Sequence, residues 1–200
     1  MLNLRVVVAC IGAVTAAFLI TAAMHALALR LPDSDTGAIG TASTSSTGAG
    51  LPTRLKIPSL DIDARVQQVG INKKGEMGIP DNFRDVAWYA YGPAPGEKGS
   101  AVIDGHVDNA LALSGVFKRL HEVRAGDEVI VVTESGAQLR FIVVDVQTYP
   151  YADVPLDLIF TRADAARLNL ITCAGTWVSG LRTYDKRTVV YTIFSNAIGL

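Results

Sequence analysis

The chain has 200 residues, which allows one domain of ordinary size and an additional segment. Half of its residues are hydrophobic, and a net charge of −1 gives no basic surface of the kind that binds nucleic acid. The sequence has no glycine-rich phosphate loop after a strand and no Cys/His cluster with zinc spacing.

The first 30 residues contain a long apolar run that predicts a membrane anchor. From Val6 to Leu29 there is no charged residue, and at about 1.5 Å per residue the run spans a hydrocarbon core roughly 30 Å thick. Arg5 precedes the run and few basic residues follow it, which places the N-terminus in the cytoplasm and the rest outside. A cleaved signal peptide is the alternative, because Ala26-Leu27-Ala28 has the small-x-small form of a cleavage site.

The next segment, residues 31–52, is rich in Gly, Ser, Thr and Ala and contains no aromatic residue. Such a composition buries too little apolar surface to offset the entropy of ordering. We therefore expect a flexible linker that holds a folded domain, residues 53–200, away from the membrane.

The domain carries short segments with β patterning, as in Arg54–Pro58 and Ile62–Val66, where apolar and polar residues alternate. Seven or eight such strands predict a mainly β fold, and the pattern alone fits a closed barrel and a sandwich equally well. Two short helices are expected, one around Val116–Leu120 and one that begins at Thr161 with Asp164 at the third position of its cap. The other expected strands are Val86–Tyr89, Ser100–Asp104, Asp127–Thr133, Leu139–Val146, Leu168–Thr172 and Thr188–Phe194.

Cys173 is the only cysteine outside the first ten residues, and it follows the buried strand Leu168–Thr172. A lone cysteine is often only a small buried hydrophobe. A domain outside the membrane with one cysteine cannot form an internal disulfide, so a free thiol there has no structural benefit. These observations favour a nucleophilic role for Cys173.

A thiol becomes a good nucleophile when a nearby cation favours the thiolate, and the sequence offers two candidates. His106 follows Gly105 at the end of an expected strand, and Arg187 precedes the expected last strand. His25 lies in the apolar run, and we expect His121 to be a solvated residue on a short helix.

Taken together, these motifs resemble the sortases, cysteine transpeptidases of Gram-positive cell surfaces. Leu170-Ile171-Thr172-Cys173 is similar to the family's Thr-Leu-x-Thr-Cys motif, and the order Gly-His, Cys, Arg matches over roughly residues 53–195. The stretch Gly105–Asp108, followed by Phe117–Leu120, resembles the actinobacterial branch labelled class F or class E.

The resemblance implies an eight-stranded β-barrel with short crossover helices and a catalytic set of His106, Cys173 and Arg187. The implied reaction cleaves an LPxTG-type sorting signal between Thr and Gly through a thioacyl intermediate on Cys173. The acyl group then passes to an amine acceptor, a peptidoglycan precursor or a pilin lysine. The reaction requires no cofactor and no metal, and we expect a monomer anchored by one membrane span with its catalytic domain outside the cell.

Three residues are expected to support this site. Thr172 precedes the nucleophile in the motif, and Asp108 either orients His106 or forms a turn beside Asn109. Arg182 lies in the expected loop Ala174–Lys186 and is the second candidate for the catalytic arginine.

Two further expectations concern substrate and class. Tyr149–Phe160 falls where the family has its substrate-binding loop, although a plain crossover fits as well. The alternative functions are a cysteine peptidase that releases the acyl group to water and a non-catalytic barrel that binds a surface protein.

Overall fold

The computed structural model describes residues 50–109 and 111–198. The predicted anchor and most of the predicted linker lie outside these residues. Among the described residues, no helix combines the length and the apolar character needed to cross a bilayer.

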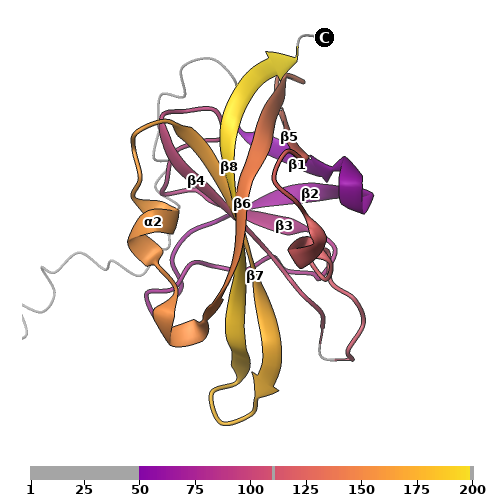
Figure 1. Ribbon diagram of the computed structural model, residues 1–200, viewed down its shortest axis with the longest axis vertical. Helices are drawn as coiled ribbons and strands as arrows, with labels where there is room; N and C mark the ends of the chain where they lie inside the picture. The colour runs from indigo at the N-terminus through magenta and orange to yellow at the C-terminus, as the bar shows by residue number, and fades with distance from the viewer. Residues whose placement is uncertain (1–49, 110, 199–200) are drawn as a thin grey trace, which may run out of the picture. The chain divides into compact units, whose positions relative to one another are not determined.

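The described chain folds into a closed barrel of eight strands, which decides between the barrel and the sandwich (Figure 1). The strands follow one another around the barrel in the order β1-β2-β3-β4-β7-β8-β6-β5. The neighbours β2–β3 and β4–β7 are parallel, and the other pairs are antiparallel. The strands are β1 (Pro52–Ile57), β2 (Ile62–Val69), β3 (Val86–Tyr89), β4 (Gly99–Gly105), β5 (Glu128–Thr133), β6 (Gln138–Pro150), β7 (Ala166–Val178) and β8 (Thr183–Ile198).

The barrel interior is filled by alternate side chains from the strands, together with Phe117 from the segment after β4. Leu168 and Leu170 of β7 and Val190 of β8 point into this core. The residues between them point outward, so each strand in this part of the barrel carries an inner and an outer row.

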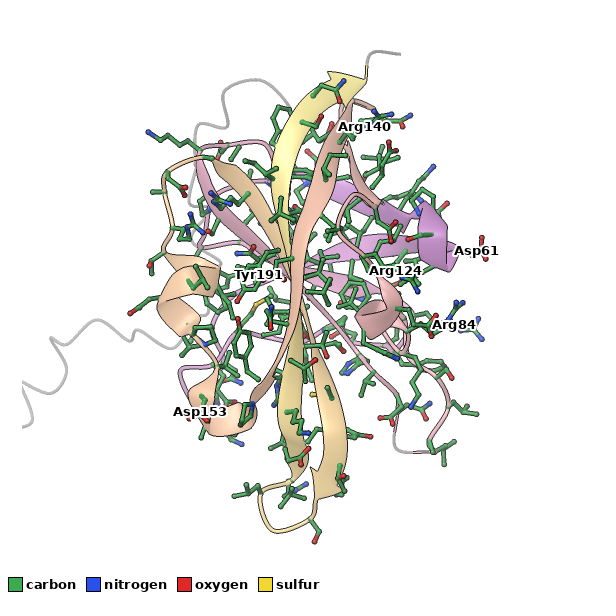
Figure 2. The ribbon with its side chains drawn as sticks, viewed as in Figure 1. Asp61, Arg84, Arg124, Arg140, Asp153 and Tyr191 are labelled. Atoms are coloured by element: carbon green, nitrogen blue, oxygen red, sulfur yellow. The ribbon has the colours of Figure 1, made fainter. Side chains whose placement is uncertain are left out.

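A second apolar layer covers the outer face of β4, β7 and β8. It joins Val102, Val189 and Tyr191 with Ile159 of α2 (Leu156–Phe160). Tyr191 of this layer is labelled in Figure 2. The fold therefore buries both faces of these strands where α2 packs on them, and outer-row residues beyond this layer, such as Asp104, Cys173 and Arg187, are partly buried.

The helices are short, as predicted, but neither expected helix lies where it was predicted. Around Val116–Leu120, residues 116–119 form turns that lead into a 3₁₀ turn at Leu120. Thr161 does not begin a helix. It ends α2, where its Oγ1 donates to the carbonyl oxygen of Asp157 at 2.7 Å, and β7 begins five residues later at Ala166. A threonine hydroxyl can form hydrogen bonds with backbone groups at the start or at the end of a helix, so the sequence pattern did not distinguish a helix start from a helix end. The 3₁₀ turns are η1 (Pro58–Leu60), η2 (Leu120–Glu122) and η3 (Tyr151–Asp153).

The prediction of a loop over Ala174–Lys186 is also wrong. β7 continues to Val178 and β8 begins at Thr183, so the two strands form a long hairpin with only residues 179–182 between them. Figure 1 shows this hairpin running beyond the neighbouring strands. Arg187 is consequently the fifth residue of β8 and lies inside a paired ladder.

Candidate functional site

The end of β4 brings His106 to the outer face of the barrel. Ile103 belongs to the interior core and Val102 to the outer layer. Because side chains alternate along a strand, Asp104 and His106 belong to the same outer row as Val102. The ring of His106 is half-buried, and its Nε2 lies 3.2 Å from the carbonyl oxygen of Pro80.

Two glycines allow the chain to pack tightly around His106. A Cβ at Gly105 would lie 2.5 Å from the ring of Phe117, and a Cβ at Gly115 would collide with the carbonyl group of His106. Phe117 in turn donates its N–H to the carbonyl oxygen of His106 at 2.9 Å. The backbone that carries the imidazole is therefore fixed by contacts that larger residues would prevent.

Cys173 lies on β7, between the strands that carry the other two predicted residues. Across the antiparallel ladder it is directly opposite Arg187 of β8. Across the parallel ladder Asp104 pairs with Ile171, so His106 and Cys173 lie two residues further along their respective strands. The register places all three predicted catalytic residues on one face of three adjacent strands.

Thr172 connects the end of β4 to β7. Its buried hydroxyl donates to the carbonyl oxygen of Gly105 at 2.7 Å. This bond joins the residue before His106 to the residue before Cys173, so it holds the two strand ends in register.

Arg187 is held by its own hairpin and by an aromatic ring. Its Nη1 donates to the carbonyl oxygens of Tyr184 at 3.0 Å and Lys186 at 2.8 Å, and its Nη2 donates to Oγ1 of Thr183 at 2.8 Å. The ring of Tyr151 in η3 stacks on the guanidinium, with its centroid 4.6 Å from Cζ. The segment after β6 thus reaches the site through Tyr151.

The thiol of Cys173 is partly buried, and this burial raises its pKa above the ordinary value. The positive charge of Arg187 opposes the rise, whereas the carboxylates of Asp104 and Asp108 add to it. Arg187 is thus the charge that favours the thiolate within the described site.

Asp108 contacts the hairpin. Its Oδ2 accepts a hydrogen bond from the hydroxyl of Tyr184 at 2.5 Å and lies 3.9 Å from Nζ of Lys118. This bond raises the pKa of the Tyr184 phenol to about 12. The turn beside it is formed by Asn109, whose Oδ1 accepts two backbone N–H groups. Asp108 therefore joins the loop after His106 to β8, while the His106 ring has Pro80 as its described partner.

Arg182 lies at the tip of the hairpin, away from Cys173. It is exposed, and its φ of 53° belongs to the turn between Val178 and Thr183. Val178 is five positions beyond Cys173 along the strand, roughly 16 Å at about 3.3 Å per residue. The structure does not bring Arg182 to the thiol.

Three residues of the site were not predicted: Asp104, Tyr151 and Tyr184. Asp104 had a visible signal, since a residue two positions before His106 on a strand shares its face. Tyr151 lies within Tyr149–Phe160, which the resemblance to sortases marks as a substrate-binding loop, but nothing singled out Tyr151 in that segment. Tyr184 had no signal, because its contact depends on how the hairpin folds back on the barrel.

The family comparison settles the class of protein. The family model described as the sortase domain matches residues 55–193, well over half of the chain. The chain belongs to the sortase family. No curated protein shows significant sequence similarity to it.

Solved sortases share the fold at low sequence identity. Sortase A from Listeria monocytogenes is 20% identical with a TM-score of 0.56, over 76% of this chain and 92% of that one. Sortase C from Streptococcus pneumoniae, described in terms of catalysis and pilin substrate specificity, is 16% identical with a TM-score of 0.57, over 74% and 71%.

Sortase A from Corynebacterium diphtheriae is 18% identical with a TM-score of 0.56. The match covers 74% of this chain but 62% of the diphtheria chain, less than two thirds of its length. At such identities the likeness shows the sortase barrel, and the roles of individual residues have to be argued from the site itself.

Proposed function

We propose that this sortase is a cysteine transpeptidase with Cys173 as its nucleophile, His106 as its acid and base, and Arg187 as its oxyanion donor. The observation that carries the proposal is the register. It places a thiol on the middle strand, a histidine directly after the end of one neighbouring strand and an arginine directly opposite on the other. A nucleophile, a proton carrier and a hydrogen-bond donor to oxygen are the three parts that acyl transfer requires.

In the first step, the Cys173 sulfur attacks the carbonyl carbon of the Thr-Gly bond in an LPxTG-type sorting signal. The C–N bond breaks, His106 gives a proton to the leaving amine of glycine, and a thioester remains on Cys173. In the second step, the amine acceptor attacks the thioester and gives its proton to His106. The C–S bond breaks and an amide forms. We propose a peptidoglycan amine or a pilin lysine as the acceptor.

Arg187 is suited to stabilise the oxygen on which negative charge develops. A guanidinium has five N–H donors, and the hydrogen bonds among the described residues engage three of them. The remaining donors lie on the residue directly opposite Cys173. The stack of Tyr151 on the guanidinium restricts its orientation and so supports this role.

We further propose that the apolar run Val6–Leu29 anchors the chain in the cell membrane and that residues 31–49 are the tether, because Leu51 packs against the barrel core and β1 begins at Pro52. The catalytic domain would then meet secreted substrates on the outer side. The sequence pattern alone supports this placement.

The test uses a sorting-signal peptide with and without an added amine, followed by mass spectrometry of the enzyme and of the products. The expected result is a thioacyl adduct on Cys173 and an amide product that requires the amine. Cys173→Ala should abolish both, because the change removes the nucleophile and little volume. Release of free acid only, with amine present, would indicate the peptidase, and the absence of any adduct would indicate the non-catalytic binder.

A further inference from the structure

A partly buried carboxyl lies beside the three site residues and has no role in the steps above. Asp104 is two positions before His106 on β4, on the same outer row, and it pairs across the parallel ladder with Ile171. Its other neighbour in the barrel is Ala87 of β3, which is fully buried. The apolar layer formed with α2 packs on Val102, two residues before Asp104 on the same row. An ionisable group in such surroundings is costly to keep charged.

Burial accordingly raises the pKa of the Asp104 carboxyl to about 7, although the charge of Arg187 and the N–H of Gly105 favour its ionised form. The carboxyl therefore gains and loses its proton in the neutral range, where an ordinary aspartate stays ionised. Its charge acts on Cys173 as well, because ionised Asp104 raises the pKa of that thiol.

Charged and titratable groups face Asp104 from several elements. β7 contributes Cys173 and β8 contributes Arg187, which act on Asp104 from two strands. His106 and Asp108 follow on its own strand and loop. β3 contributes Tyr89, diagonal to Asp104 on the outer row, and α2 contributes Asp157, which is exposed. Arg187 is the one permanent cation in this set.

We propose that Asp104 is a positioning residue that sets how strongly Arg187 favours the thiolate of Cys173. When the carboxyl carries a proton, the full charge of Arg187 acts on the sulfur. When the carboxyl loses its proton, its negative charge repels the thiolate and offsets part of the attraction, so the proton returns to sulfur. The consequence for turnover rests on the proposed function, but the proton equilibrium of Cys173 does not.

The test measures the rate at which iodoacetamide alkylates Cys173 in the full-length protein between pH 5 and pH 8. The modified peptide is identified by mass, so that Cys10 does not contribute. Asp104→Asn removes the charge and keeps the shape. We expect its rate relative to wild type to be close to one at pH 5 and to rise to about threefold or more by pH 8, because the thiolate fraction follows the thiol pKa.

The matched control is Asp153→Asn, an exposed carboxyl on η3 that is labelled in Figure 2. Its rate relative to wild type should stay at one at every pH. Asp104→Ala, which also lacks the charge, should change the rate in the same direction as Asp104→Asn. A ratio for Asp104→Asn that does not change with pH, or opposite effects of the two variants, would overturn the proposal. Neither result depends on whether the protein transfers acyl groups.

Discussion

Two arginines of one hairpin differ in what holds their side chains. Arg187 is bound by two carbonyl oxygens, one hydroxyl and the ring of Tyr151, whereas Arg182 is exposed in the turn. A group that stabilises a transition state has to be held in place before the reaction begins. This difference supports the proposal that Arg187, and not Arg182, is the oxyanion donor.

We predict that Arg187→Ala lowers kcat by about 10²–10³, with little change in KM, because an oxyanion donor acts mainly in the transition state. Arg187→Lys should restore little activity, since an ammonium lacks the planar fork of donors. Arg182→Ala is the matched control and should remain close to wild type. Steady-state kinetics on one sorting-signal peptide measures all three. A strong loss of kcat in Arg182→Ala, with Arg187→Ala close to wild type, would show that the oxyanion donor is Arg182 and not Arg187.

We also predict that Asp104→Asn stabilises the fold at neutral pH. The folded-state pKa of about 7 lies above the ordinary 3.8, so the native state binds more protons than the unfolded state between these values. The contribution of Asp104 to stability is therefore present below about pH 4 and is lost as the pH rises through about 7.

Asparagine does not ionise, so the Asp104→Asn variant does not lose this stability as the pH rises. The variant should exceed wild type in free energy of unfolding by on the order of 1–3 kcal/mol at pH 8, and by almost nothing near pH 4. The larger value is an upper limit, because the side chain is only partly buried. Urea unfolding at both pH values gives the comparison, with Asp153→Asn as a surface control. An equal difference at the two pH values would show that Asp104 does not titrate in this range.

At the scale of elements, the sequence predicted most strands but not their lengths. Alternation marks a strand where one face is buried, as in β5, whose Val129 and Val131 point inward. The hairpin arms beyond Cys173 lack this signal, because Gly175 interrupts the first arm and the turn residues Ser179 and Gly180 follow only a few positions later. Pairing continues through a bulge between Ala174 and Trp177, where Thr176 N–H binds Oδ1 of Asp185 at 2.7 Å. The hydrogen bonds that extend the hairpin join two separate segments, so the local sequence of either segment does not predict them.

The contact between β4 and β7 gives a prediction for Thr172. Thr172→Val keeps the shape of the side chain but removes the buried hydrogen bond to the Gly105 carbonyl. We expect a loss of about 1–2 kcal/mol in free energy of unfolding. We also expect a lower kcat/KM, because the bond lies between the residues that precede His106 and Cys173.

Thr192→Val is the matched control. Thr192 is also buried on the barrel wall, and its hydroxyl donates to the carbonyl oxygen of Leu168 at 2.7 Å, at the other end of β7. It should cost similar stability and leave kcat/KM nearly unchanged. Denaturant unfolding and peptide kinetics on both variants test the pair. Equal loss of activity in the two would mean that Thr172 contributes only to general stability.

At the scale of the whole chain, the alternation of apolar and polar residues could not predict that the barrel closes. Strands of a sandwich and of a barrel alternate in the same way, so alternation cannot decide between them. The decision rests on pairs distant in sequence, such as Leu55 of β1 with Val131 of β5. The resemblance to sortases predicted the barrel because a family carries such long-range pairing with it, whereas local patterns do not.

The same closure predicts where the chain can be shortened. Leu51 packs against the core and its carbonyl oxygen accepts the N–H of Glu134, while β1 joins β2 to β5. A chain that begins at Gly50 keeps these contacts, and the proposed anchor and tether carry no chemistry. We predict that it unfolds cooperatively and cleaves a sorting-signal peptide at the full-length rate. A chain that begins at Ser59 lacks β1, exposes the edges of β2 and β5 and should not fold.

Circular dichroism during urea unfolding and peptide kinetics compare the two shortened chains with the full-length protein. An inactive or unfolded chain from Gly50 would show that residues before it belong to the folded unit. A folded chain from Ser59 would show that β1 is dispensable and that the barrel can remain open between β2 and β5. The expected contrast between two chains that differ by nine residues comes from the single strand that closes the barrel.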